Sequence, residues 1–224
     1  MGVTMRATYR EQLDDVLDGL VRMADDVAIA VGRATHALLT ADLQTAEGVI
    51  AGDERLDRAM AVAERSLFEL LARQAPVAGE LRLVVASLRM VAELERMGDL
   101  AAHVAKIARL RYPGPAVPDR LRPSFTRMAD VAEAMVRDAG QALAERSPTR
   151  AAALRDQDEE MDRLRRGQFT VLLGGDWADG VEAAVDAALL GRYYERIADH
   201  ATTVARRVAY IVTGESVDDD WPEP

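Results

Sequence analysis

The stretch that decides the fold is GRYYERIADHATTVARRVAYIVTGE, residues 191–215. Apolar residues recur every three or four positions along it, starting just before it, at Leu189, Tyr193, Ile197, Ala201, Val204, Val208 and Ile211. This period is typical of one buried face of an α-helix, here roughly 30 residues long. The alternating apolar and polar runs of β-strands do not occur in the sequence. Together with 40 alanines, the pattern predicts an all-α protein.

Helix-breaking residues divide the remaining sequence into five further helices. The predicted ranges are 8–40, 42–74, 79–111, 119–146 and 148 to the glycine pair at 174–175. Pro76 ends the second helix, because proline lacks an N–H and disfavours helical geometry in the residue before it. A Ser-Pro pair at 147–148 suits the cap and first turn of the fifth. The sixth helix is predicted to be capped by Asp176, with Asp179 three residues on, and to end at Gly214.

The sequence is duplicated. An offset of 105 aligns Asp53, Glu54 and Asp57 with Asp158, Glu159 and Asp162, and an offset of 100 aligns Glu95, Arg96 and Asp99 with Glu195, Arg196 and Asp199. Repeats in this order predict two tandem three-helix bundles built from long, antiparallel helices. We assign residues 1–112 to the first repeat, 113–118 to a Pro/Gly-rich linker, 119–214 to the second repeat and 215–224 to an acidic, disordered tail.

Composition excludes several classes of function. The chain has 38 acidic against 28 basic residues, a net charge of −10, which argues against binding to nucleic acid or to anionic membranes. It has no cysteine, and therefore no disulfide, thiolate metal site or cysteine nucleophile. Charges interrupt every apolar run before it could span a bilayer, and the start of the chain lacks the apolar core of a signal peptide. We expect a cytoplasmic protein.

Pairs of carboxylates mark the candidate site. Glu95 and Asp99 stand four residues apart on one helix face, as do Glu195 and Asp199, and like charges at this spacing invite a compensating cation. Hard oxygen ligands favour Mg, Ca, Mn or Fe. The predicted ligands, expected on the surface of the bundles, are Glu95, Asp99, Glu195 and Asp199 with Asp53, Asp57, Asp158 and Asp162 from the neighbouring helices, and His103 as a possible extra ligand.

Alternative interpretations stay open at this point. Acidic helix faces are often only solvated, and basic neighbours such as Arg96 and Arg196 could replace a metal as the compensating charge. The sequence has no Gly-rich phosphate loop, no GxSxG and no HExxH, so no catalytic or cofactor-binding residue is predicted. A metal-storage protein, a metal-dependent enzyme and a purely structural helical adaptor remain as alternatives to a binding protein.

Four segments of the sequence resemble the PhoU family of bacterial phosphate-signalling regulators. RQAPVAGELRL (73–83), AELERMGDLAAHVAKIA (92–108) and GRYYERIADHATTVARRVAYIVTGE (191–215) are similar to family motifs, and VIAGDERLDRAM (49–60) is similar to its first acidic helix. The similarity extends from about residue 5 to 215 and is strongest to the actinobacterial branch. Two departures stand out: Glu80 replaces the usual aspartate, and Ala198 replaces a glycine.

The resemblance implies a negative regulator of phosphate uptake and of the phosphate-starvation response, not an enzyme. It implies an adaptor between the ATPase subunit of the phosphate-specific ABC transporter and a sensor histidine kinase, reaching the membrane only through these partners, with a homodimer expected. Some members of the family carry Fe, Zn, Mg or Mn on the acidic motifs and others carry none. We expect Arg82, Arg96 and Arg196 to organise the carboxylates of this chain.

Overall fold

The computed structural model of the chain describes residues 2–215, with side chains from residue 9 onward. It contains long helices α1 (Gly2–Thr40), α2 (Leu43–Gln74), α3 (Ala78–Arg111), α4 (Arg122–Glu145), α5 (Pro148–Leu172) and α6 (Gly180–Thr213), with a 3-10 turn η1 (Asp119–Leu121) before α4. No strand occurs within residues 2–215, so the all-α prediction is confirmed there. The predicted disordered tail, beyond Glu215, lies outside the described residues.

Local chemistry explains where the helices begin and end. The Asp42 carboxylate accepts a hydrogen bond from the Thr45 N–H at 3.0 Å and caps α2. The Ser147 hydroxyl accepts one from the Arg150 N–H at 3.2 Å, and Pro148 opens α5. Pro76 stands in the connection between α2 and α3. These boundaries agree with those predicted from the sequence.

Three details of the prediction are wrong. Helix α1 begins at Gly2 instead of residue 8, since no breaker intervenes. Asp179 stands at the N-cap of α6 as predicted, but neither its side chain nor that of Asp176 caps the helix, and the Asp179 carboxylate pairs instead with Arg120 Nε at 3.0 Å. The first position of the predicted buried stripe of α6 is wrong: Leu189 is exposed, and the buried positions at this point are Ala187 and Leu190.

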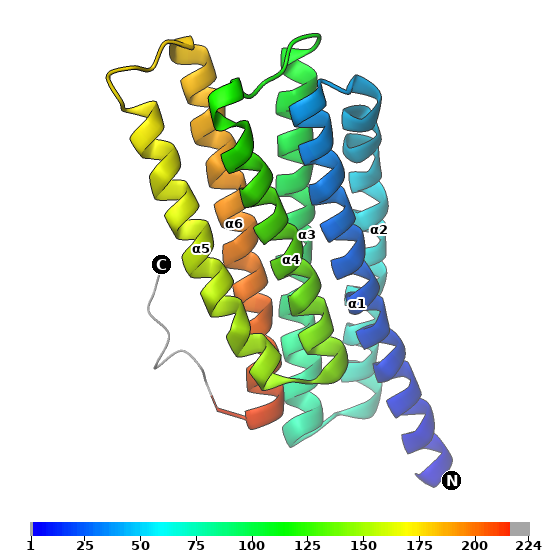
Figure 1. The fold of residues 1–224 in the computed structure, drawn as a ribbon. Helices are drawn as coiled ribbons and strands as arrows, with labels where there is room; N and C mark the ends of the chain where they lie inside the picture. The colour runs from blue at the N-terminus through cyan, green and yellow to red at the C-terminus, as the bar shows by residue number, and fades with distance from the viewer. Residues whose placement is uncertain (1, 216–224) are drawn as a thin grey trace.

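The two halves of the chain form two three-helix bundles that pack against each other (Figure 1). Within each half all three helices are in contact, and between the halves α1 packs on α4 and α3 packs on α6. The paired helices run in opposite directions, which relates the halves by an approximate two-fold rotation. Helices α2 and α5 lie at the two outer edges, α2 against α1 and α3, and α5 against α4 and α6.

Small residues let the two bundles approach closely. A Cβ added to Gly140 of α4 would stand 2.8 Å from the Cβ of Ala24 in α1, a distance that no real pair of non-bonded carbons adopts.

Ion pairs also join the two bundles. At the far end of α3, Arg111 donates to both carboxylate oxygens of the buried Asp186 in α6, at 2.5 and 3.1 Å. His200 of α6 pairs with Glu93 of α3 at 2.7 Å. The two bundles are therefore joined by close backbone packing of α4 on α1 and by two ion pairs between α3 and α6.

Tyr194 is the largest side chain fully buried in the core. Its ring packs near Phe125 of α4, and its hydroxyl lies 2.7 Å from Oγ1 of Thr35 in α1. Because Thr35 donates its own proton to the Val31 carbonyl at 2.8 Å, Tyr194 is the donor in this contact. Burial raises the pKa of Tyr194, so the phenol keeps this proton. The second repeat is thus hydrogen-bonded to the first inside the core.

No helix in residues 2–215 has the length and the apolar character needed to cross a membrane.

The buried hydrogen bond gives a testable difference between neighbouring tyrosines. Tyr194→Phe should lower the free energy of unfolding by about 1 kcal/mol, the net value of one buried hydrogen bond, measured by urea denaturation. The matched control is Tyr193→Phe, which removes a hydroxyl with no hydrogen-bond partner among residues 9–215 and should change stability by less than about 0.5 kcal/mol. Equal losses for both variants would show that the hydrogen bond to Thr35 contributes nothing.

Candidate functional site

The predicted carboxylates come together in two clusters, one in each repeat. The first cluster, between α2 and α3, consists of Asp53, Asp57, Glu95 and Asp99, and the second cluster, between α5 and α6, consists of Asp158, Asp162, Glu195 and Asp199. In each repeat the charge of the aspartate on the last helix acts on the first aspartate of the preceding one, Asp99 on Asp53 and Asp199 on Asp158. The offsets read from the sequence therefore describe a real structural correspondence.

The first cluster is open to solvent on its outer side. Glu95 and Asp57 are exposed, while Asp53 and Asp99 are half-buried. Burial raises the pKa of Asp53, and the charges of Asp57 and Asp99 raise it further. Lys106 and His103, both on α3, act in the opposite direction. This cluster thus holds more negative than positive charge at its inner end.

The second cluster is deeper. Burial, followed by the charges of Asp199 and Asp162, raises the pKa of Asp158 from 3.8 to about 6. Arg206 lowers the pKa of Asp158 and so only partly offsets these effects. Burial also raises the pKa of Asp199, although Arg192 nearby acts against it. Two carboxylates in this cluster are therefore held in surroundings that disfavour their charged form.

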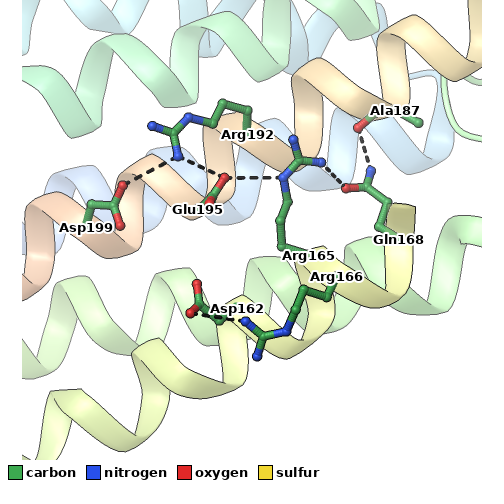
Figure 2. A network of polar contacts seen from close by, with 8 residues as sticks. All are labelled: Asp162, Arg165, Arg166, Gln168, Ala187, Arg192, Glu195 and Asp199. Atoms are coloured by element: carbon green, nitrogen blue, oxygen red, sulfur yellow. Dashed lines mark hydrogen bonds and ion pairs between the residues drawn. The ribbon is translucent and has the colours of Figure 1, made fainter. Parts of the chain in front are cut away.

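Two arginines reach into the second cluster (Figure 2). The Arg192 Nη1 atom lies 3.0 Å from Glu195 Oε2 and 3.9 Å from Asp199 Oδ2. Arg165 of α5 approaches the same Glu195 oxygen from the other side, with its Nε at 3.3 Å. Glu195 is thus held between two guanidinium groups, one from each helix.

Further contacts fix Arg165 in place. Its Nη1 donates to Gln168 Oε1 at 2.6 Å, and Gln168 in turn donates to the Ala187 carbonyl at 2.5 Å (Figure 2). The Phe169 ring lies 4.1 Å from the guanidinium carbon, close enough for a cation–π contact. Only 9% of Arg165 and 1% of Gln168 are exposed. The Arg165 guanidinium is therefore buried and fixed in position within the second repeat.

The three arginines that were predicted to organise the carboxylates make little contact with them. Arg96 lies 3.7 Å from Asp99, and both side chains are substantially exposed, so this ion pair is weak. Arg196 is exposed and makes no ion pair within residues 9–215. Arg82 lies against Gly214, and it is separated from Glu95 by 13 residues of helix, about 20 Å.

The sequence patterns did not predict a role for three residues of this network, Arg165, Gln168 and Arg192. The signal for the first two was present, because they continue the buried stripe of α5 that runs through Leu154 and Met161. Polar residues at buried positions need partners, so their spacing indicates a buried polar network. For Arg192, three residues before Glu195, only its place next to the predicted ligand pair could have suggested a role.

His103 connects the two halves of the site. Its ring centroid is 5.5 Å from that of Tyr193 in α6, while its charge acts on Asp53 in α2. Its Nδ1 lies 2.8 Å from the Asp99 carbonyl, a bond in which the ring nitrogen donates. The surface over α2, α3 and α6 is therefore continuous, and both clusters lie on the same side of the molecule.

The donor sets differ in how well they fit a metal ion. Carboxylate oxygens beside an imidazole are suitable ligands for a hard divalent cation, and the first cluster combines both. As the side chains lie, no three Asp, Glu or His groups among the described residues are arranged to share one ion. In the second cluster guanidinium groups occupy the space beside Glu195. The metal ligands named from the sequence therefore stay a prediction.

The departure at Ala198 has a local explanation. A Cβ on Gly98, the equivalent residue of the first repeat, would stand 2.3 Å from Leu56 Cδ2. The residue equivalent to Leu56 in α5 is Met161, whose unbranched side chain can adapt its shape to a neighbouring methyl group. Ala198 and Met161 are both buried, so the exchange keeps the core filled.

A groove in the surface lies between α1 and α2, and none of the cluster carboxylates lines it. Its volume is about 650 Å³, with Met23 and Leu70 among its apolar lining. This groove is therefore not part of the acidic site.

Replacing Asp158 with asparagine should stabilise the protein at neutral pH. Because the pKa is raised from 3.8 in the unfolded chain to about 6 in the fold, the charged carboxylate costs stability above pH 6. This cost is relieved as the pH falls from 6 towards 3.8, because the native state takes up the proton first. After allowance for solvent screening, urea denaturation should show a gain of about 1 kcal/mol at neutral pH that is mostly lost near pH 4.

The control is Glu159→Gln, which removes a neighbouring carboxylate whose side chain is 64% exposed. It should leave the stability and its pH dependence nearly unchanged. A gain for Asp158→Asn that is the same at both pH values, or a loss at neutral pH, would contradict the described surroundings of Asp158.

Comparison with known proteins gives one consistent result. The family model described as "PhoU domain" matches residues 20–108 and again 125–208, once in each half. The phosphate-specific transport system accessory protein PhoU homolog 2 of Mycobacterium tuberculosis is 49% identical over 210 residues, 94% of this chain and 99% of that protein. PhoU homolog 1 of Mycobacterium leprae is 47% identical over 96% of this chain and 97% of its own length.

Solved structures agree with this result. The crystal structure of PhoU from Pseudomonas aeruginosa has a TM-score of 0.84 and 28% identity, and the match covers 92% of this chain and all of that one. The regulatory protein PhoU from Streptococcus pneumoniae, at 23% identity and a TM-score of 0.85 over 94% of this chain and 99% of that one, shares the fold. With a family model matching both halves and relatives similar over nearly the full length, the chain belongs to the PhoU family.

Proposed function

We propose that this protein is a regulatory accessory protein of a phosphate-specific transport system and has no enzymatic activity. In this proposal it is a cytoplasmic homodimer that represses phosphate uptake and the phosphate-starvation response when phosphate is plentiful. It does so as an adaptor, binding the ATPase subunit of the transporter and a sensor histidine kinase. The names of the mycobacterial relatives, accessory proteins of the phosphate-specific transport system, support the choice of system.

The observation that carries the adaptor role is a duplicated surface. At the start of α3 and of α6, exposed apolar residues occupy equivalent positions, Leu81 and Val85 in one repeat and Val181 and Val185 in the other. Phe68 of α2 and Leu173, just after α5, are exposed at equivalent positions beside them. Exposed apolar patches of this kind are typical of protein-binding surfaces.

Each patch leads into an acidic cluster. Leu81 and Asp99 are separated by 18 residues, or five turns, and therefore lie on the same face of α3, as do Val181 and Asp199 on α6. A partner with an apolar stripe next to Lys or Arg residues would match such a face in both shape and charge. Two copies on one molecule would allow a transporter subunit and a kinase to be bound by a single protein.

A divalent cation at the first cluster is part of this proposal. Its carboxylates and His103 suit Mg, Mn, Fe or Zn, and a bound cation would supply charge stabilisation between the acidic face and an acidic group of a partner. The chain's own residues would orient that face, since α2 and α3 pack against each other along their length. Phosphate sensing would then belong to the transporter, because the chain has no glycine-rich phosphate loop.

Affinity capture from phosphate-replete cells of the natural host tests the proposal. The tagged wild-type protein should recover a phosphate-transporter ATPase subunit and a sensor kinase. Asp99→Asn with Asp199→Asn should reduce this recovery about tenfold, which corresponds to about 1.4 kcal/mol of binding free energy. The same double variant should leave a phosphate-starvation reporter switched on in phosphate-rich medium.

The matched control is Glu54→Gln with Glu159→Gln. Glu54 and Glu159 are adjacent in sequence to Asp53 and Asp158, and the two substitutions remove the same charge, but these side chains are 79% and 64% exposed and pair with Arg58 and Arg163 of their own helices. The control should recover both partners as wild type does. Recovery of neither partner by the wild-type protein would count decisively against the adaptor function.

A further inference from the structure

The two acidic clusters are duplicated, and so is one basic residue that acts on each of them, Lys106 in the first and Arg206 in the second, but Arg165 and Arg192 are not. The carboxylates occupy equivalent positions in both repeats, whereas the positions equivalent to Arg165 and Arg192 are Met60 and Ala92. Gln168 and Gly191 correspond to Ala63 and Val91. In the first repeat Met60, Ala63 and Val91 are buried apolar residues of an ordinary core. The polar network around the second cluster is therefore specific to the second repeat.

Arg165 supplies this cluster with a fixed positive charge. Arginine stays charged at any physiological pH, and here it is held by Glu195 at 3.3 Å, by Gln168 at 2.6 Å and by the Phe169 ring at 4.1 Å. Moving it away would break these contacts and leave Gln168, which is 1% exposed, without a partner on its carbonyl oxygen. Displacement by an incoming ion is therefore costly.

Gly191 shows that the backbone is adapted to this arginine. A Cβ at this position would stand 1.9 Å from Gln168 Oε1 and 2.7 Å from Arg165 Nη1. Only glycine leaves room for the two side chains beside α6, and Val91, the equivalent residue in the first repeat, faces no such network. The absence of a side chain at Gly191 is a feature of the backbone, separate from the ion pairs.

Arg192 adds a second positive charge beside the motif carboxylates of this cluster. Its Nη1 lies 3.0 Å from Glu195 and 3.9 Å from Asp199, so one guanidinium spans both carboxylates of the motif. A divalent cation bound by these oxygens would need to approach them to about 2.0–2.6 Å. Figure 2 shows the guanidinium nitrogens in the space around Glu195 that such an ion would use.

We propose that the second cluster of this chain takes no metal ion, because Arg165 and Arg192 provide the cation from within the protein. The family resemblance implies metal at equivalent motifs in both repeats, and the second repeat does not fit that expectation. The duplicated motifs have thus diverged: one face is open to an external cation, and the other carries an internal one. This inference concerns cation binding alone and does not depend on the partners proposed above.

Counting bound Mn²⁺ by electron paramagnetic resonance tests this directly, on the full chain at moderate ionic strength. In a Glu95→Gln/Asp99→Asn variant, which disables the first cluster, the second cluster should bind no Mn²⁺. Binding of about one Mn²⁺ per chain that disappears on adding Asp199→Asn would overturn the proposal.

A second experiment asks whether removing the arginines allows the second cluster to bind Mn²⁺. On the same background, Arg165→Met with Arg192→Ala converts the second cluster to the residues of the first repeat and should add about one Mn²⁺ per chain. Arg192→Ala alone, at a side chain that is 52% exposed, should give detectable Mn²⁺ binding where the parent variant shows none, and it keeps the test valid if the double variant does not fold. The matched control is Arg196→Ala, which removes the same charge from the same helix and should add no ion. Failure of both Arg192→Ala variants to gain Mn²⁺ would overturn the role of the arginines.

Discussion

The antiparallel packing of α3 on α6, together with that of α1 on α4, is the constraint on which the rest of this structure depends. It joins two bundles, each with its own three helices, into one body through Arg111–Asp186, Glu93–His200 and the hydrogen bond from Tyr194 to Thr35. Because α2 packs on α3 and α5 packs on α6, the acidic clusters of the two repeats both lie beside the α3–α6 pair, on the same side of the molecule. A single binding face with two related halves follows from this packing.

The two clusters on that face differ in how their negative charge is compensated. In the second cluster burial and the neighbouring carboxylates raise the pKa of Asp158 to about 6, and Arg165 and Arg192 both pair with Glu195. The first cluster replaces both arginines by Met60 and Ala92 and leaves Glu95 exposed. Burial of carboxylates without full internal compensation costs folding free energy, a cost that an external cation or a basic partner can offset. The first cluster is the one open to an external cation, although the second cluster carries the raised pKa of about 6 at Asp158.

Most of the fold could be predicted from the sequence, because local signals determine it. Pro76, the cap at Asp42 and the Ser147-Pro148 pair end or begin helices through short-range chemistry. The duplication then identified equivalent positions correctly. What it could not supply was how the halves dock, so the contact of Tyr194 with Thr35 and that of His103 with Tyr193 were not predicted. The error at Leu189 arose because an exposed apolar patch continues the apolar pattern of the core.

The candidate site was predictable in its carboxylates but not in its counter-ions. Spacing along a helix identified the four motif acids and their neighbours, whereas Arg165 reaches Glu195 from another helix, 30 residues away in the sequence. A crystal structure of the protein grown with Mn²⁺, with data collected at the manganese absorption edge, tests the central claim most directly. The account predicts no anomalous peak in the second cluster, with both guanidinium groups in contact with Glu195. An anomalous peak between Asp158, Glu195 and Asp199, with Arg165 and Arg192 turned away, would contradict it.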